Sequence, residues 1–377
     1  MSFLWGVAIA SHQNDGGAPA SDWTQAEAEG RYPHTSGEGA RFREHLEGDL
    51  DLIAHDLRGN ALRLSIEWAR VEPRPGEWDL AEIAYLHRLF AAARARGITI
   101  IATLHHFTSP AWLGGWEAPA TAEAFARYAA FIAREFKGQI AYYLTLNEPS
   151  NLIVGAYAGG LMPPFRKGPL AALRATRVMH RAHILAYHAI HAEDPQAQVS
   201  LTEFNGVLPL GPIAVLYSPG LYLARLFRRL PLDYVSLHYY GDVSFADMGA
   251  FPTRPDNFDT RPDHFRRAIV AAWRLFKLPV LIGENGLATR NHAPRRDGWD
   301  APRYMEAHVA AMQAAMAEGV PVIGYLWWTL TDNYEWGTYD SRFGLYRVEC
   351  QAGDFTRIPT PAVATFRRLA SAPPPCC

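Results

Sequence analysis

Hydrophobic positions along the chain form short apolar runs, each followed by a longer segment with apolar residues at helical spacing. The apolar runs predict strands at residues 1–10, 61–65, 98–104, 140–146, 199–202, 234–238, 280–282 and 322–326. The segments between them predict helices at 45–57, 83–93, 125–136, 170–191, 221–229, 263–277, 302–318 and 361–369. Eight strand-then-helix units predict the α/β class and a single (β/α)8 TIM barrel, which needs about 250 residues.

The residues beyond this minimum fall mainly after predicted strands, at 11–44, 105–120, 147–169 and 327–359. Such a barrel builds its active site from the loops at the carboxyl ends of its strands, so we expect elaborated loops on that face. No interdomain linker is visible, and we expect one catalytic barrel over residues 1–371. The remaining residues, 372–377, contain three prolines and two cysteines and are expected to form a flexible tail.

Composition narrows the class of partner. The chain has 377 residues, of which 49% are hydrophobic and 20% charged, and a formal net charge of -2, so we expect no nucleic-acid partner. No run approaches the roughly 20 apolar residues of a membrane span, and the apolar N-terminus lacks a basic leader before Arg31. Three cysteines, Cys350, Cys376 and Cys377, give no disulfide framework, which favours a cytoplasmic location.

Two of the predicted strands end in a glutamate. Glu148 follows the run that ends at Leu146, and Glu284 follows the run at 279–282. Either residue alone would be more typical of a salt bridge or a helix terminus. Each, however, has an amide neighbour, Asn147 or Asn285, and a backbone-shaping Pro or Gly beside it. Two carboxylates at strand ends could therefore face one substrate.

The segments TLNEP at 145–149 and IGENG at 282–286 resemble the acid/base and nucleophile motifs of glycoside hydrolase family 1, the retaining β-glucosidases and β-galactosidases. The resemblance covers residues 3–369 and is strongest over 60–149 and 282–345. It implies that Glu148 is the acid/base and Glu284 the nucleophile. A retaining mechanism then requires the two carboxyl groups to lie about 5 to 5.5 Å apart, with no cofactor and no metal.

Arg63 lies inside a predicted apolar strand, where an unpaired cation would be costly. A carboxylate such as Glu284 is its most natural partner, and the resemblance adds Tyr240 as a hydroxyl donor to the same group. We expect ionised Glu284 to raise the pKa of Glu148 by repulsion, so that Glu148 is an acid first. Esterification of Glu284 would then lower the pKa of Glu148, so that Glu148 becomes a base.

The resemblance also implies a sugar-binding set, with Trp328 as a stacking platform and Glu335 and Trp336 on the far hydroxyls. Its members are Gln13, His106, Asn147, Trp328, Glu335, Trp336 and Phe343. Singly, the amide residues could satisfy loop backbone groups and the tryptophans could be core. A carboxylate at Glu335 would repel a 6-phosphate, so an unphosphorylated sugar is expected.

Three positions depart from the family pattern. Phe107 stands where the family usually has Trp, Gly283 where it has Thr, and His238 where it has Asn. We expect the first two to alter packing around the sugar and the third to alter hydrogen bonding around Glu284. The stretch 203–233 and the loop after Tyr240 are short for the family, which predicts an open leaving-group side. Residues 203–205 offer either a polar contact or a surface role.

The sequence thus predicts a retaining β-glycosidase that acts on terminal unphosphorylated β-D-glycosyl residues of small β-glycosides or short β-linked oligosaccharides. β-Glucosidase activity is expected first, and β-galactosidase or β-fucosidase activity is also consistent with the motifs. A transglycosylase and a glycanase of a neighbouring family in the same clan stay open as alternatives.

Two readings from other classes are less favoured. A sugar-binding barrel without catalysis would typically have lost a carboxylate, and both are present. A metal-dependent hydrolase would use His105 with His106, or His180 with His183. Adjacent strand residues point to opposite faces, and the second pair lacks a third ligand.

Overall fold

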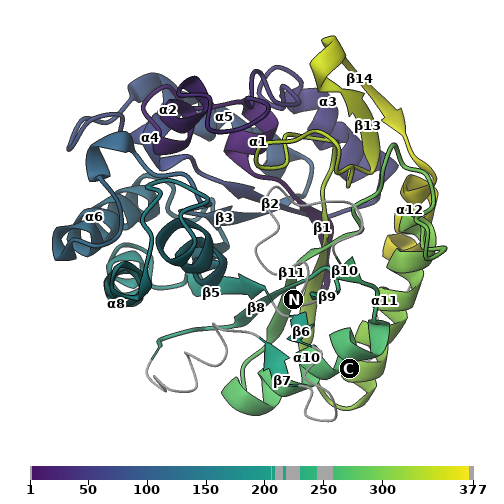
Figure 1. Ribbon diagram of the computed structural model, residues 1–377. Coiled ribbons are helices and arrows are strands. Elements are labelled where there is room, and N and C mark those ends of the chain that lie inside the picture. Colours follow the sequence, from purple (N-terminus) through teal and green to yellow (C-terminus); the bar gives the residue numbers. More distant parts are fainter. Residues whose placement is uncertain (1, 205, 209–214, 218–229, 244–257, 373–377) are drawn as a thin grey trace.

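A closed barrel of eight parallel strands forms the centre of the computed structural model, which describes residues 2–204, 206–208, 215–217, 230–243 and 258–372 (Figure 1). The strands are adjacent in the order β1-β12-β11-β8-β5-β4-β3-β2. Their bounds are β1 Leu4–Ala8, β2 Ala61–Ser65, β3 Thr99–Thr103, β4 Tyr142–Asn147, β5 Gln198–Phe204, β8 Val235–Tyr239, β11 Val280–Asn285 and β12 Val322–Trp328. The predicted (β/α)8 architecture is confirmed.

The barrel closes because β1 pairs with both β12 and β2. Leu4 lies opposite Gly324 on one side, and Gly6 lies opposite Ala61 on the other. A Cβ at Gly6 would lie 2.1 Å from the carbonyl oxygen of Ala61, so only glycine allows this close approach of the two strands.

Helices surround the barrel in Figure 1, and each follows the strand that the sequence assigned to it. The long ones are α5 Leu80–Ala95, α6 Pro119–Glu135, α8 Pro169–Glu193, α10 Pro262–Phe276, α11 Ala301–Ala317 and α12 Pro361–Ser371. The helix predicted at 45–57 is α3 Leu46–Asp51 continued by a π-helical turn, η1 Leu52–Asp56. The helix predicted at 221–229 lies outside the described residues, as do residues 373–377 of the predicted tail.

Short elements fill the long loops that follow β1, β3, β4 and β12. They are α1 Ser11–Asp15, α2 Asp22–Ala28, η2 Ala111–Leu113, α7 Pro149–Leu152, η3 Ile153–Ala158 and the hairpin β13 Tyr346–Glu349 with β14 Asp354–Pro359. Further short elements are α4 Trp68–Val71, η4 Cys350–Ala352 and the strand pairs β6 Gly206–Leu208 with β7 Val215–Tyr217 and β9 Asp242–Val243 with β10 Phe258–Asp259.

Strand alternation produces two apolar cores. Leu62 and Leu64 of β2 pack in the larger core between the strands and the helices. Residues such as Ile101 and Leu326 form a smaller core inside the barrel. Arg63 lies between two outward-facing leucines on β2 and is fully buried, so its guanidinium group enters the barrel rather than solvent.

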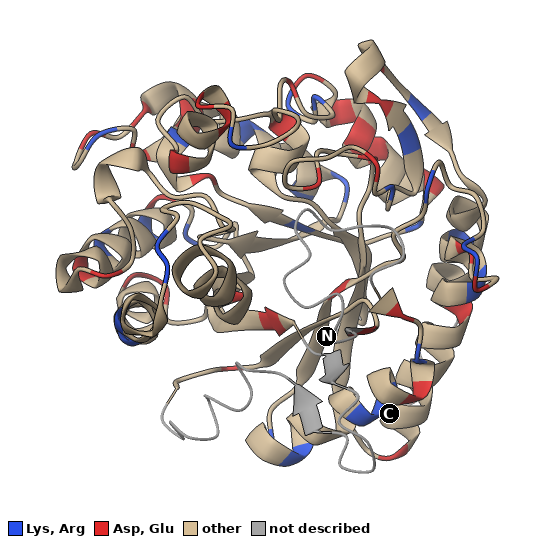
Figure 2. Ribbon diagram, viewed as in Figure 1, with Lys and Arg blue, Asp and Glu red and all other residues tan. Residues whose placement is uncertain are grey.

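The charges of the described residues are mixed in sign. Figure 2 shows Lys and Arg interspersed with Asp and Glu over the outer helices and loops. Among the described residues, none of the helices has the length and apolar content needed to cross a bilayer.

Candidate active site

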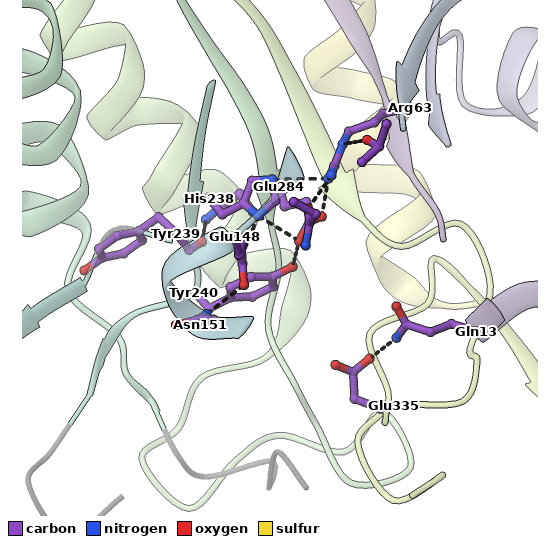
Figure 3. Close-up of polar contacts among 12 residues, drawn as sticks. Gln13, Arg63, Glu148, Asn151, His238, Tyr239, Tyr240, Glu284 and Glu335 are labelled. Carbon is purple, nitrogen blue, oxygen red and sulfur yellow. Dashed lines mark hydrogen bonds and ion pairs between the residues drawn. The ribbon is translucent and has the colours of Figure 1, made fainter. Parts of the chain in front are cut away.

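Glu148 lies directly after β4, where the chain turns into the short helix α7. Its backbone adopts φ 42° and ψ 55°, in the left-handed region that costs a non-glycine residue on the order of 1 kcal/mol or more. Pro149 follows at the first position of the helix, and the N–H of Glu148 donates to the carbonyl of Thr202 on β5 at 2.9 Å. This turn directs the buried Glu148 side chain toward the centre of the site (Figure 3).

Glu284 lies near the end of β11, and both of its oxygens have partners. Arg63 of β2 donates from Nη1 to Oε1, and the Tyr240 hydroxyl donates to Oε2. Both partners suit a carboxylate, because one is a cation and the other a hydroxyl donor. The structure therefore brings together three residues that the sequence had grouped.

The two glutamates face each other across the mouth of the barrel. One carboxylate oxygen of Glu148, one of Glu284 and a ring nitrogen of His238 all lie within 4.8 Å of one another. This distance between oxygens is shorter than the roughly 6.5 to 9.5 Å between the carboxyl groups of an inverting enzyme, which must hold a water between them. It agrees with the shorter spacing of double displacement.

Arg63 organises the floor of the site. Its Nε donates to Thr103 Oγ1 at 3.0 Å, its Nη2 donates to Asn147 Oδ1 at 2.5 Å, and its Nη1 lies 3.1 Å from His238 Nε2. Asn147, which the sequence assigned to the sugar, thus has its carbonyl oxygen engaged with Arg63.

Burial raises the pKa of Glu148 to about 7, while the hydrogen bond from Asn151 and the charge of Arg63 act in the opposite direction. The direction agrees with the expectation from the sequence, but the main cause is desolvation rather than the charge of Glu284. A carboxyl group with this pKa is protonated in a large fraction of molecules at neutral pH, as a general acid requires.

A second polar group lies beside this pair, between α1 and the loop after β12. Gln13 donates from Nε2 to Glu335 Oε2 at 2.9 Å, and the Trp328 side chain also hydrogen-bonds to Glu335. Burial, with a smaller effect of the Glu284 charge, raises the pKa of Glu335 to about 8. Gln13 Oε1 has no hydrogen-bond partner among the described residues, so it can accept a bond from a ligand hydroxyl.

Aromatic rings enclose the space next to Glu335. The His106 ring is stacked with two tryptophan rings. Its centroid lies 5.9 Å from that of Trp328 and 6.0 Å from that of Trp336. Phe107 packs edge-on against Trp336 at 5.1 Å. These rings provide the apolar faces on which a sugar ring can lie.

Phe343 belongs to the same buried cluster as Trp328 and lies beside the Glu284 group. Its ring lies 5.7 Å from that of Tyr240, which in turn donates to Glu284. The structure therefore gathers all the predicted site residues at one end of the barrel, in two adjoining groups around Glu284 and Glu335.

Two contacts of Glu148 were missed by the sequence analysis. Asn151 donates to Oε2 at 2.7 Å, and His238 Nδ1 lies 2.6 Å from Oε1. Asn151 could have been found, because a helix that begins at Pro149 places it one turn from Glu148. His238 was singled out only as a departure near Glu284, but its shortest carboxylate contact is with Glu148.

Glu203, at the end of β5, extends the acidic group. Its Oε1 accepts a hydrogen bond from Ser150 at 2.9 Å, and burial raises its pKa to about 8. It is a buried residue rather than a surface one, and the adjoining Asn205 lies outside the described residues.

A metal ion does not fit the arrangement well. Glu148, His238 and Glu284 have the spacing of a cation site, but Arg63 already contacts both His238 and Glu284 with a fixed positive charge. The histidines that the sequence offered as metal ligands have other partners.

His105 Nε2 pairs with Ser109 at 3.0 Å, whereas His106 stacks on Trp328. His183 Nδ1 pairs with Thr145 at 2.7 Å. Among the described residues, neither pair belongs to a group with the spacing of a metal site.

The comparison with protein families decides the assignment. The model described as Glycosyl hydrolase family 1 matches residues 1–213 and 233–372. The chain belongs to glycosyl hydrolase family 1.

Known members of family 1 resemble the chain at modest identity. Beta-glucosidase A of Thermotoga maritima is 28% identical over 415 residues, covering 92% of each protein. Galactolipid galactosyltransferase SFR2 of Arabidopsis thaliana is 25% identical over 335 residues, or 79% of this chain and 53% of that protein. The rice protein named Beta-glucosidase-like SFR2 matches over 56% of its length, so the chain spans about half the length of both SFR2 proteins.

Solved structures of family 1 have the same fold. A beta-glucosidase of Thermotoga maritima in complex with deoxynojirimycin has a TM-score of 0.87 at 24% identity, covering 97% of each chain. The beta-glucosidase 1317 has a TM-score of 0.81 at 29% identity over the full length of both chains.

Proposed function

We propose that the chain is a retaining β-glycosidase that hydrolyses terminal, unphosphorylated β-D-glycosyl residues, foremost β-glucosides. The observation that carries the proposal is the pair of buried carboxylates with oxygens within 4.8 Å and unequal surroundings. Glu284 is ion-paired and doubly hydrogen-bonded, whereas Glu148 is desolvated and has a raised pKa. Relatives named beta-glucosidase and beta-galactosidase support the substrate class.

The proposed reaction has two displacements. Glu284 attacks the anomeric carbon while Glu148 gives its proton to the leaving oxygen, so the glycosidic bond breaks and a glycosyl ester forms on Glu284. Water then loses a proton to Glu148 and attacks the same carbon, which releases Glu284 as a carboxylate. Two inversions give net retention at the anomeric carbon.

The residues around Glu335 are proposed to hold the sugar. Gln13 and Glu335 offer hydrogen bonds to hydroxyls, and Trp328 and Trp336 offer apolar ring faces. A carboxyl group at Glu335 disfavours a phosphorylated sugar, because it supplies no positive charge to pair with the phosphate and repels the phosphate whenever it is ionised. His106 is proposed to contact the same sugar.

Paired variants test the two glutamate roles. Glu284→Ala should abolish turnover, and azide should restore it by forming an α-glycosyl azide in a single displacement. Glu148→Ala should still form the glycosyl ester from an activated aryl glycoside, and azide should then yield the β-glycosyl azide. Azide products of the same configuration from both variants, or full activity in either, would refute the assignment.

Glycosyl transfer is the second candidate. The relative named galactolipid galactosyltransferase favours it, because transfer needs the same ester and only replaces water by an acceptor hydroxyl. The ratio of transfer product to released sugar, measured with a glycoside and increasing acceptor alcohol, separates the two. Family membership removes the neighbouring-family glycanase from consideration. A binding barrel without catalysis would release no chromophore from an aryl β-glycoside.

The extent of the catalytic unit and its compartment are also proposals. The family match, which runs to residue 372, supports one barrel unit over residues 1–371. The low cysteine count supports a cytoplasmic location.

A further inference from the structure

His238 lies between the two glutamates on β8, where the family pattern has Asn. Its Nδ1 is 2.6 Å from Glu148 Oε1 and 3.3 Å from Glu284 Oε2, and the ring is fully buried. Figure 3 shows the ring at the meeting point of contacts from Arg63, Glu148 and Glu284. A single side chain therefore touches both carboxylates.

The contact with Arg63 fixes which ring nitrogen carries the proton. Arg63 Nη1 lies 3.1 Å from Nε2, and a guanidinium group can only donate hydrogen bonds. Nε2 must therefore accept, and in a neutral ring the proton is on Nδ1. Burial keeps the ring neutral, because it lowers the pKa of His238 to about 3. The Nδ1–H then points at the carboxylate oxygens.

Gly283 provides the space that the ring needs. A Cβ at this position would lie 3.1 Å from His238 Nε2, 3.2 Å from its Cδ2 and 2.4 Å from Ser236 Oγ. The family pattern has Thr here, and a threonine would press on the His238 ring and on Ser236. The two departures at 238 and 283 thus form one structural unit rather than two independent changes.

We propose that His238 is a positioning residue that holds Glu148 through its Nδ1–H, with Arg63 setting the tautomer and Gly283 making room for the ring. The inference rests on the proposed function of Glu148. His238 and Asn151 donate to different oxygens of Glu148, Oε1 and Oε2, so the two hydrogen bonds together fix the orientation of the carboxyl group.

Two amide variants of His238 distinguish the role of Nδ1 from that of Nε2. The amide group of Asn falls where Nδ1 lies, so His238→Asn keeps a donor for Glu148. The amide group of Gln falls where Nε2 lies, so His238→Gln keeps the contact with Arg63 but loses the donor. The first should act as the conservative rescue and the second as the disruptive change.

The test compares leaving groups. For His238→Gln, we expect kcat/KM to fall about tenfold or more further with phenyl and alkyl β-glycosides than with a dinitrophenyl β-glycoside, because only the former need the acid. The basic limb of its pH profile should move upward, since a donor to the charged form of Glu148 is lost. His238→Asn should stay near the wild type in both respects.

The charged and titratable groups that face the ring come from several elements. They are Arg63 of β2, His106 after β3, Glu148 after β4, Tyr240 directly after β8 and Glu284 of β11. Glu148 is expected to respond most to the loss of the Nδ1 donor, because its oxygen is 2.6 Å from Nδ1 and that of Glu284 is 3.3 Å away. The same profiles recorded for Tyr240→Phe provide the control, because that change acts on Glu284.

Equal losses for all leaving groups in both amide variants would overturn the proposal and leave His238 a packing residue. Neutron diffraction of the unmodified protein gives an answer that does not depend on variant folding. A deuteron on Nδ1 is expected, and a deuteron on Nε2 would overturn the proposal. If the wild type fails to hydrolyse any aryl β-glycoside, the proposed function fails as well; normal wild-type hydrolysis with unaffected variants refutes His238 alone.

Discussion

At the scale of single residues, Arg63 connects the parts of the site. It reaches from the interior of β2 to side chains on β3, β4, β8 and β11, and none of its charge is exposed to solvent. A planar group with five donors in fixed directions can make these contacts together, and an ammonium group cannot. The geometry of Glu284 therefore depends on the shape of this side chain as well as on its charge.

We expect Arg63→Lys to lower kcat/KM by about 100-fold, because the contacts to Asn147 and His238 are lost while a positive charge remains. Steady-state kinetics with an aryl β-glycoside gives the measurement. Arg181→Lys is the matched control, since Arg181 forms an exposed ion pair with Glu123. Equal activity of the two variants would show that charge alone is sufficient at position 63.

At the scale of elements, the closure of the barrel depends on close contact between β1 and β2. We expect Gly6→Ala to lower the free energy of unfolding by about 1 to 3 kcal/mol, because the added methyl group meets the backbone of Ala61. Urea unfolding provides the measurement. Gly48→Ala, in α3 with open space around it, should leave stability unchanged or raise it. Similar losses in both variants would contradict this account of closure.

The strands were predictable because each is an apolar run bounded by polar or turn residues, as in 61–65 and 322–326. The short loop helices were not, because α1 and α7 have too few residues to show helical periodicity. Sequence motifs located Glu148 and Glu284, but the bridging position of His238 depends on register between β8 and β11. That register, and the space beside Gly283, come only from the folded structure.

At the scale of the whole molecule, buried acids make stability depend on pH. Burial raises the pKa of Glu148, Asp15 and Asp22 to about 7 and that of Glu203 and Glu335 to about 8. The folded state holds these protons more tightly than the unfolded state, so their contribution is full below the unfolded pKa and is lost as pH rises through the folded values. The histidines with lowered pKa values affect the pH dependence of stability only below about pH 6.5, where histidines of the unfolded state take up protons.

We therefore expect the free energy of unfolding to decrease between pH 6.5 and 8, measured by urea titration at several pH values. Glu203→Gln should flatten this dependence, because a neutral amide does not titrate. The amide oxygen can still accept the hydrogen bond from Ser150, so this contact is kept. Glu123→Gln, at an exposed position, should keep the slope of the wild type. A stability that rises or stays constant over this range would show that these acids are not held protonated by the fold.

The central claim is that Glu148 and Glu284 act in two successive displacements at one anomeric carbon. Proton NMR of the first sugar released from a β-glucoside, recorded before mutarotation, tests it most directly. The spacing of the two carboxylates predicts that the β-anomer appears first and that the α-anomer grows only later. Initial release of the α-anomer would contradict the account.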